Sequence, residues 1–332
     1  MMTTADGPQT VPAGSEAGPW LDRSVSVRVP ATSANLGPGF DAFGLALGVH
    51  DVVHATVIGG GLEIEVTGIG EPTATHGERH LVVQAMRAAF EVLGGQPPGI
   101  GLRCVNAIPH GFGLGSSAAA IVAGILAARA LRNGGIERLP DESVLQLAAD
   151  LEGHADNVAA CLAGGLTIAW GTSRGSAGGS VRCLRLDPLP GLAPVICVPA
   201  EPLATATARQ VLPDSVPHAD AAKNAARAAM LVAALTQDPP LTDPGVLLDA
   251  TEDFLHQPYR ADSMPGTAEL VRVLRDAGIP AVVSGAGPAV LALIMPNAGA
   301  GQAAVTAIAA ALGHEWTVRA LSFDRDGAAV RP

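Results

Sequence analysis

The chain of 332 residues contains a single lysine, Lys223, and little positive charge of any kind. Lys and Arg together number 20 against 31 Asp and Glu, so the formal net charge at pH 7 is −11. Nucleic acids and anionic membranes attract proteins through clustered positive charge. The charge balance therefore argues against both as partners, and any phosphate chemistry must rely on backbone amides, arginine and metal.

Cysteine pairs and long apolar runs are also missing. Cys104, Cys161, Cys183 and Cys197 are widely spaced and form no CxxC motif, which favours reduced, mostly buried thiols of a cytoplasmic protein over a zinc site or a disulfide framework. No stretch approaches the roughly 18 apolar residues of a membrane-spanning helix. Residues 1–22 lack the basic start and apolar run of a signal peptide, and their Thr, Gly, Pro and Ala content predicts a flexible tail.

What the chain does have is apolar material and glycine, with 48% hydrophobic residues, 15% charged residues and 40 glycines. This composition supports a real core and argues against disorder. Because the length exceeds what one core usually serves, we expect two domains, residues 23–187 and 188–332. Helical and strand-like segments mixed in each half, with the strands expected to be antiparallel, indicate the α+β class.

Two local patterns make specific structural predictions. Val25, Val27 and Val29 alternate with polar residues, which predicts a half-buried strand that ends at Pro30. Residues 141–161 are predicted as one continuous helix with Asp141 as its N-cap.

The most informative segment is PHGFGLGSSAA, residues 109–119, which leads directly into an alanine-rich helix. Alternate glycines let the backbone approach a ligand closely, and the first amides of a helix form a cradle for anions. The segment lacks the GxxxxGK[ST] pattern of a Walker loop, and its glycine spacing differs from GxGxxG. An ordinary glycine turn before a helix remains the alternative.

This segment resembles the P-x-G-x-G-L-G-S-S signature of the GHMP kinases, and the resemblance extends from about residue 24 to the C-terminus. It implies a ribosomal-S5-like N-terminal domain, a ferredoxin-like C-terminal domain, and ATP as the phosphate donor. The ATP-binding residues that it implies are Pro109, Gly111, Gly113, Leu114, Gly115, Ser116, Ser117 and Ala118.

A second segment, PATSANLGPGFD at residues 30–41, resembles the family members that phosphorylate L-homoserine. The resemblance implies that Asn35 and Asp41 bind the amino-acid end of the substrate. A carboxylate and an amide oxygen suit an ammonium group. Turn capping within a glycine-rich loop is the alternative role for both residues.

The segment EGHADN, residues 152–157, resembles the same members. By this resemblance Glu152 and Ser117 hold Mg²⁺, and His154 and Asn157 contact the substrate. A carboxylate, a hydroxyl and the nucleotide phosphates are a reasonable ligand set for Mg²⁺, which takes few protein ligands. A purely structural role remains the alternative for His154.

Asn157 also bears on the mechanism, because relatives such as mevalonate kinases place an aspartate there. An asparagine cannot accept the proton of the substrate hydroxyl at neutral pH. We therefore expect catalysis by positioning and charge stabilisation without a dedicated base.

Two arginines supply positive charge in segments TATAR, residues 205–209, and HQPYR, residues 256–260. The resemblance places Thr205, Arg209 and Arg260 near the substrate, and gives both arginines catalytic roles. A guanidinium can pair with a carboxylate through two parallel hydrogen bonds. Solvated surface arginines are the alternative.

A third signature, SGAGP at residues 284–288, is implied by the resemblance to pack beside the phosphate loop. The implied reaction is phosphorylation of L-homoserine by ATP on the route to threonine, in a homodimer. Two rivals remain, a mevalonate-type kinase of the family and a catalytically silent ATP-binding regulator. Lys223 is assigned no role.

Overall fold

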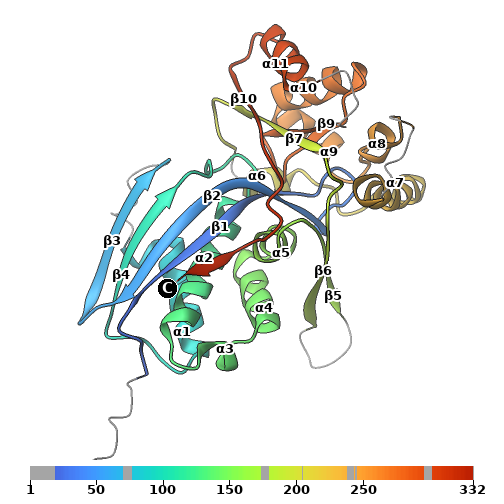
Figure 1. The fold of residues 1–332 in the computed structure, drawn as a ribbon. Coiled ribbons are helices and arrows are strands. Elements are labelled where there is room, and N and C mark those ends of the chain that lie inside the picture. Colours follow the sequence, from blue (N-terminus) through green and yellow to red (C-terminus); the bar gives the residue numbers. More distant parts are fainter. Residues whose placement is uncertain are drawn as a thin grey trace, which may run out of the picture.

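The computed structural model describes residues 19–69, 77–172, 179–203, 205–237, 243, 245–294 and 301–331, without the side chains of residues 205–207. The strands form two sheets, and helices pack on both (Figure 1). This arrangement confirms the α+β class. Among the described residues, no helix is long and apolar enough to cross a lipid bilayer.

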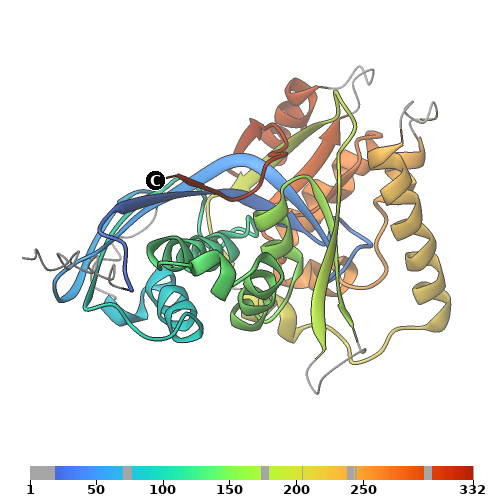
Figure 2. The ribbon, with the colours of Figure 1, turned by 60° about the horizontal axis from the view of Figure 1, so that its bottom comes forward.

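The first sheet belongs to the N-terminal half and is covered by helices on one face (Figure 2). Its strands follow the order β11-β1-β2-β4-β3, and the β5–β6 hairpin joins it through β2. The strands are β1 (Ser24–Ala34), β2 (Phe43–Val57), β3 (Gly61–Gly68), β4 (Gly99–Asn106), β5 (Leu166–Thr172), β6 (Ser180–Leu186) and β11 (Ala329–Arg331). The helices of this half are α1 (Leu81–Val92), α2 (Ser116–Leu131), α3 (Gly135–Arg138), α4 (Asp141–Glu152) and α5 (Asp156–Ala163).

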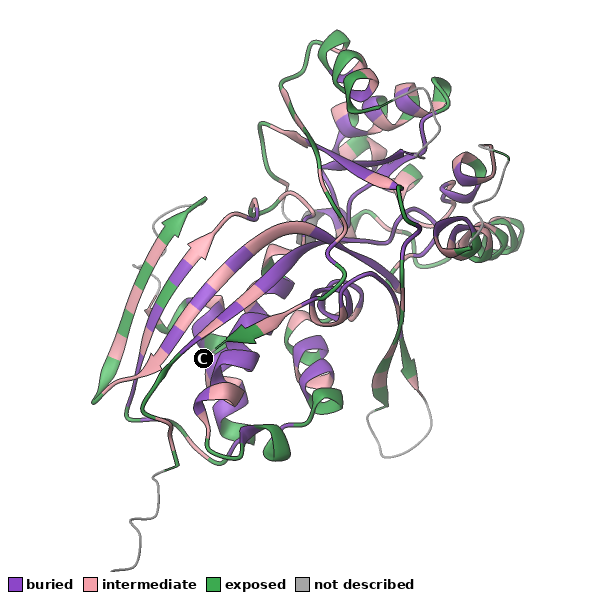
Figure 3. Cartoon of the chain, viewed as in Figure 1, coloured by how far each residue is buried: buried purple, intermediate pink, exposed green. Residues whose placement is uncertain are grey.

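Helix α2 is the central helix of this half, and it is buried on almost every side (Figure 3). Its alanines and its one glycine allow neighbouring helices to approach closely; a Cβ on Gly124 would lie 2.5 Å from the Val82 carbonyl oxygen of α1. The helix that follows the glycine-rich segment is therefore held rigidly by the core. Its N-terminus is a fixed point on which a binding site can be built.

The second sheet, in the C-terminal half, has the order β10-β7-β9-β8 and is antiparallel throughout. Its strands are β7 (Ala193–Pro199), β8 (Ala281–Val283), β9 (Val290–Ile294) and β10 (Trp316–Ala320). The helices of this half are α6 (Thr205–Gln210), α7 (His218–Thr236), α8 (Gly245–Ala250), α9 (Gln257–Arg260), the 3₁₀ helix η2 (Ala261–Ser263), α10 (Pro265–Asp276) and α11 (Gln302–Ala311). Side chains of α10 and α11 pack with this sheet around a separate cluster that includes Val195, Leu270 and Val305.

The expectation that strands are antiparallel in each half is wrong at one place, because β3 and β4 run parallel. Parallel neighbours need a long crossover connection, usually with a helix. The segment between the two strands contains α1, and it supplies that crossover. The alternation of apolar and polar residues along a strand does not show whether its neighbour runs parallel or antiparallel.

The predicted end of the first strand is also wrong, since β1 continues through Pro30 to Ala34. The register with β2 shifts between Pro30 and Ala31, so a bulge accommodates the proline without ending the strand.

The predicted helix of residues 141–161 is instead two helices, α4 and α5, separated at Gly153, whose φ is +86°. Asp141 is not the N-cap. The cap position is Pro140, and the Asp141 carboxylate accepts a hydrogen bond from Arg129 at 2.6 Å. The break has a functional consequence, because it lets Glu152 and Asn157 approach the start of α2 from two directions.

At each end of the chain, residues pack outside the domain to which the sequence assigned them. Trp20, in the predicted tail, packs edge-on against Phe90 with ring centroids 5.1 Å apart. At the other end, β11, the short strand beside the C label in Figure 1, pairs with β1 of the first sheet. Asp324 also contacts His50 of β2 at 2.6 Å. The chain therefore returns to the N-terminal half after completing the second sheet. The prediction of residues 1–18 as a flexible tail lies outside the described residues.

The four cysteines are free thiols, as predicted, and all but Cys183 are buried. Burial raises the pKa of Cys104 and of Cys197 to about 12, so these thiols stay protonated at neutral pH.

Candidate active site

The glycine-rich segment 109–119 forms a tight loop that ends at α2, and two of its glycines are required by geometry. Gly113 and Gly115 have φ of +75° and +69°. A Cβ on Gly113 would lie 2.1 Å from the Ser284 carbonyl oxygen, and one on Gly115 would lie 1.9 Å from Thr32 Oγ1. Both the backbone conformation and the lack of space therefore exclude a larger residue.

Elements from distant parts of the sequence hold this loop in place. The Ser284 hydroxyl donates to the Gly113 carbonyl at 2.7 Å, and the Ala289 amide donates to the Phe112 carbonyl at 3.2 Å. From β1, the Thr32 amide donates to the Leu114 carbonyl at 3.0 Å. The expected packing of the third signature beside the phosphate loop is thus confirmed.

The start of α2 has the properties of an anion site. Its N-cap is Gly115, and no side chain caps the helix. Unpaired amides in the first turn and the positive end of the helix dipole both favour a phosphate group. Gly115, Ser116 and Ser117 line the cavity in front of this turn.

The two predicted magnesium ligands touch each other. The Ser117 hydroxyl donates to Glu152 Oε2 at 2.6 Å, although the residues come from α2 and the end of α4. Burial is the main influence on Glu152 and raises the pKa of its carboxyl, while the Ser117 hydrogen bond acts in the opposite direction. A half-buried carboxylate beside a hydroxyl is a pair of hard oxygen donors that a divalent cation would stabilise. The residues therefore fit Mg²⁺.

Next to this pair, His154, Asp156 and Asn157 form a hydrogen-bonded cluster. His154 Nδ1 lies 2.8 Å from Asp156 Oδ1, and this hydrogen bond raises the pKa of His154. The Asn157 amide and its side-chain nitrogen donate to the same Asp156 oxygen, at 2.7 and 3.3 Å. The Thr32 hydroxyl donates to Asn157 Oδ1 at 2.7 Å. Asn157 is therefore a fixed polar group.

On the opposite side, Arg209 of α6 pairs with Asp41 of the first signature. Arg209 Nη2 donates to Asp41 Oδ1 at 2.7 Å and Nη1 donates to Oδ2 at 3.4 Å, a two-bond arrangement. Both side chains remain more than a third exposed, at 38% and 40%, so a ligand can reach them. These two residues were predicted to bind the two charged groups of an amino acid.

Arg260 is buried, with 1% of its surface exposed, yet it reaches the same cavity. Its Nε donates to the Ala208 carbonyl at 2.9 Å, and its Nη1 donates to His256 Nδ1 at 3.0 Å. Burial and the charge of Arg209 lower the pKa of Arg260 from its ordinary high value. The arginine is thus held rigidly beside Arg209.

Asn35 has both ends of its side chain engaged by the backbone. Its Nδ2 donates to the Gly285 carbonyl at 2.8 Å, and its Oδ1 accepts from the Asp41 amide at 2.9 Å. This residue ties the first signature to the third one and sets the position of Asp41. The turn-capping alternative describes these contacts, although Asn35 also lines the cavity.

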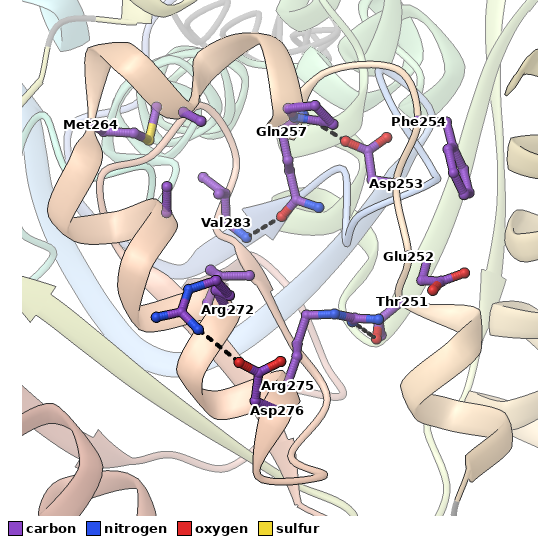
Figure 4. A pocket seen from close by; sticks show the side chains of 14 residues that line it. Thr251, Glu252, Asp253, Phe254, Gln257, Met264, Arg272, Arg275, Asp276 and Val283 are labelled. Atoms are coloured by element: carbon purple, nitrogen blue, oxygen red, sulfur yellow. Dashed lines mark hydrogen bonds and ion pairs between the residues drawn. The ribbon is translucent and has the colours of Figure 1, made fainter.

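One cavity of about 70 Å³ brings most of the predicted site residues together. Three predicted residues do not line it, namely Pro109, Ala118 and Asp41, but Asp41 is hydrogen-bonded to Arg209, which does. The side chain of Thr205 lies outside the described residues. The predicted residues that line it are Asn35, Gly111, Gly113, Leu114, Gly115, Ser116, Ser117, Glu152, His154, Asn157, Arg209 and Arg260. This cavity does not stand out by its size. A larger one, of about 400 Å³, lies between α9 and α10 and contains none of the predicted residues (Figure 4).

Sequence reasoning missed several residues of the site. Asp156 lines the cavity and holds His154, and its place in the first turn of α5, inside a motif already selected, could have indicated it. Two other residues touch the site from outside the cavity: Thr32 donates a hydrogen bond to Asn157, and His256 accepts one from Arg260. No local pattern indicates these long-range contacts.

Comparison with known proteins agrees with the geometry. The family model for the GHMP kinase N-terminal domain matches residues 80–165, and the model for the C-terminal domain matches residues 230–315. The homoserine kinase of Streptomyces coelicolor is 52% identical over 93% of this chain and 95% of its own length. That of Streptomyces avermitilis is 53% identical over 93% and 96%.

Among solved structures, the homoserine kinase of Cytophaga hutchinsonii superposes with a TM-score of 0.73 at 26% identity. The match covers 97% of this chain and 100% of that one. The chain therefore belongs to the GHMP kinase family, and its two-part fold confirms the expectation from sequence. Within the family, both Streptomyces relatives carry the name homoserine kinase.

Proposed function

We propose that the protein transfers the γ-phosphoryl group of ATP to the hydroxyl of L-homoserine, giving O-phospho-L-homoserine and ADP. The observation that carries this proposal is the single cavity in which an uncapped helix N-terminus faces a carboxylate–hydroxyl pair and two arginines. The identity to relatives named homoserine kinase supports the choice of substrate.

The phosphates of ATP bind to the amides of residues 111–117 at the start of α2 in this proposal. A separate cavity of about 290 Å³ shares Ser116 and Ser117 with the loop, and it also contains Arg79, Asn106 and His110. We assign this cavity to the nucleoside end of ATP, because it continues directly from the phosphate site. Glu152 and Ser117 hold Mg²⁺, which when bound offsets the negative charge of the phosphates.

The substrate binds between the loop and the arginines. The Asp41 carboxylate accepts hydrogen bonds from the ammonium group. Arg209 donates to the substrate carboxylate through the same two nitrogens that face Asp41 in the structure. Arg260 adds a fixed positive charge. His154 Nε2 lies 3.9 Å from Glu152 Oε1, and His154 and Asn157 line the same cavity. We assign both residues to the hydroxyl that receives the phosphoryl group.

In the reaction, the substrate hydroxyl oxygen forms a bond to the γ-phosphorus while the bond from that phosphorus to the bridging oxygen of ADP breaks. The hydroxyl proton leaves late, to phosphate or water, because Asn157 cannot accept it. The side-chain oxygen of Asn157 already accepts a hydrogen bond from the Thr32 hydroxyl. Catalysis thus rests on alignment and on the charges of the helix start, the arginines and the metal.

The mevalonate-type alternative has no ammonium group for Asp41 to bind, and the relatives named homoserine kinase argue against it. A silent regulator would have no need to keep Ser117, Glu152 and both arginines in one cavity. We further propose a cytoplasmic homodimer that binds neither nucleic acid nor membrane. Its two domains divide near residue 187, and β11 returns from the second domain to the sheet of the first. Light scattering of the purified chain tests the oligomer.

The test of the function is ADP release from Mg-ATP with L-homoserine, D-homoserine, L-serine, L-threonine, mevalonate and galactose. We expect turnover to prefer L-homoserine. Turnover on mevalonate or galactose would keep the kinase and reject the assignment of Asp41 and the arginines. ATP binding with no turnover on any compound would favour the regulator.

A further inference from the structure

His256 lies in the interior between the first signature and Arg260. It is fully buried, and its ring stacks on Phe40 with centroids 5.3 Å apart and planes inclined by 26°. The Arg260 guanidinium lies over the other part of the same Phe40 ring, 5.7 Å from its centroid. Phe40 directly precedes Asp41, so this cluster joins the two ends of the proposed substrate site.

The hydrogen bonds of His256 define its protonation state. Arg260 Nη1 can only donate, so His256 Nδ1, 3.0 Å away, must accept. The Gly37 carbonyl can only accept, so Nε2, at 3.0 Å, must donate. A neutral ring with its proton on Nε2 satisfies both contacts. Burial lowers the pKa of His256 and favours this neutral form; the charged groups that face it are Asp253, Arg260 and Asp41.

The start of α9 is fixed by hydrogen bonds of Asp253 and Gln257, two of which Figure 4 shows. Asp253 accepts hydrogen bonds from the amides of Leu255, His256 and Gln257, at 2.9, 3.1 and 2.6 Å. The Gln257 side chain accepts a bond from the Val283 amide of β8 at 2.6 Å. These bonds hold the backbone that carries His256. The ring also touches this anchor, because His256 Nε2 lies 3.4 Å from Asp253 Oδ2.

We propose that His256 is a positioning residue, which accepts a hydrogen bond from Arg260 and thereby fixes that guanidinium for binding the substrate and the transferring phosphoryl group. Through Gly37 and Phe40 it also ties Arg260 to the loop that carries Asp41. The inference rests on the proposed function, since it assigns to Arg260 the role given there.

Two isosteric variants separate the two hydrogen bonds. In His256→Asn the amide oxygen can occupy the place of Nδ1 and keep the bond from Arg260. In His256→Gln the amide nitrogen can occupy the place of Nε2 and keep the bond to Gly37. Arg260 Nη1 then loses the His256 acceptor and keeps only the longer bond to the Gly285 carbonyl, at 3.4 Å. His256→Leu removes both bonds, and His218→Asn, at the exposed start of α7, is the matched control.

For His256→Leu we expect kcat/KM for L-homoserine to fall by roughly 10- to 100-fold, the range for losing a hydrogen bond to a buried charge, with KM for ATP unchanged. His256→Asn should recover most of that loss, His256→Gln should not, and His218→Asn should behave as the wild type. Equal recovery by Asn and Gln, or wild-type kinetics for the Leu variant, would overturn the proposal. Thermal unfolding of each variant identifies any that fail to fold.

A double-mutant cycle tests whether His256 acts through Arg260. In an Arg260→Ala background, His256→Leu should reduce kcat/KM by less than about 2-fold, because the group that it positions is gone. A further full loss would assign His256 another role.

A spectroscopic readout is independent of activity. The ring-nitrogen chemical shifts of His256 in the wild type should show the Nε2–H form without change from pH 8 to 5.5. An Nδ1–H ring or a protonated ring would contradict the geometry. If the wild type does not phosphorylate homoserine, the proposed function fails while this measurement still tests the contact.

Discussion

The two sides of the proposed active site, one for phosphate and one for the substrate, are built in opposite ways. The phosphate side comes from one short stretch, residues 111–117. It consists mainly of backbone, with Gly111, Gly113 and Gly115 at positive φ. The substrate side consists of side chains, with Asp41, Arg209 and Arg260 meeting from three separate segments.

The difference lies in what each side has to recognise. A polyphosphate chain is bound by many equivalent amides, and glycine and a helix start provide these locally. An amino acid needs one positive and one negative group at a set separation, which only folded side chains can provide. We therefore expect changes on the phosphate side to affect turnover and the fold, and changes on the substrate side to affect substrate preference.

The largest effect should come from Glu152→Gln, which keeps an acceptor for Ser117 but removes the charge. We expect kcat to fall by about 100-fold or more, because a metal ion supplies several kcal/mol of charge stabilisation. Steady-state kinetics over a range of Mg²⁺ concentrations measure this, with the exposed Glu63→Gln of β3 as control. Near-normal turnover at ordinary Mg²⁺ would remove Glu152 from the metal site.

Glu152→Gln should lower kcat, but without metal it should leave the thermal stability of the folded protein unchanged or raise it. The pKa of Glu152 in the folded protein lies above its ordinary value of 4.5, so the folded state holds this proton more tightly than the unfolded state. Its contribution therefore becomes unfavourable as pH rises from 4.5 through the folded pKa. Above that window, in chelator, Glu152→Gln should melt at the same or a higher temperature. A clearly lower melting temperature would mean that the carboxylate stabilises the fold.

The second effect compares Gly113→Ala with Gly278→Ala. Both glycines have φ near +75°, but a Cβ on Gly278 meets no atom within 4 Å, whereas one on Gly113 meets the Ser284 carbonyl. Gly278→Ala should cost about 1 kcal/mol of unfolding free energy, from backbone strain alone. Gly113→Ala should cost about 3 kcal/mol or more and also raise KM for ATP. Equal costs in urea unfolding would show that the phosphate loop can move away from Ser284.

The third effect is specific to the substrate side. Arg209→Lys replaces two parallel hydrogen bonds with a point charge, so KM for L-homoserine should rise by about 10-fold while KM for ATP stays close to the wild-type value. Initial-rate kinetics with each substrate varied in turn give both constants. Unchanged constants for homoserine would exclude Arg209 from the site, and a rise confined to ATP would place it on the phosphate side.

The smallest effect should come from His154, whose pKa is raised by its hydrogen bond to Asp156. Because the folded pKa lies above the ordinary value of 6.5, the stabilising contribution is complete below pH 6.5 and is lost as pH rises through the folded pKa. The difference in unfolding free energy between wild type and His154→Gln, on the order of 1 kcal/mol at pH 6, should shrink by pH 9. A difference that does not change with pH would mean that the charge contributes nothing.

Local sequence patterns predicted most elements of the fold, because periodicity and caps act over a few residues. The pattern failed where a distant partner decided the outcome. Pro30 did not end β1, since β2 continues to pair beyond a bulge. The break of the predicted helix at Gly153 has a local cause instead, because its φ of +86° ends α4 and lets α5 start in a new direction.

For the site, the sequence by itself determined the phosphate loop and the residue types available for the chemistry. Glycine at alternate positions permits the positive φ that the loop adopts at Gly113 and Gly115, and contacts from Ser284, Ala289 and Thr32 then hold that conformation. Tertiary structure alone decided which groups meet: the contact of Ser117 with Glu152, the pairing of Asp41 with Arg209, and the bond from Arg260 to His256. These contacts depend on how the two sheets and their helices pack, and packing sums many small interactions that no short segment contains.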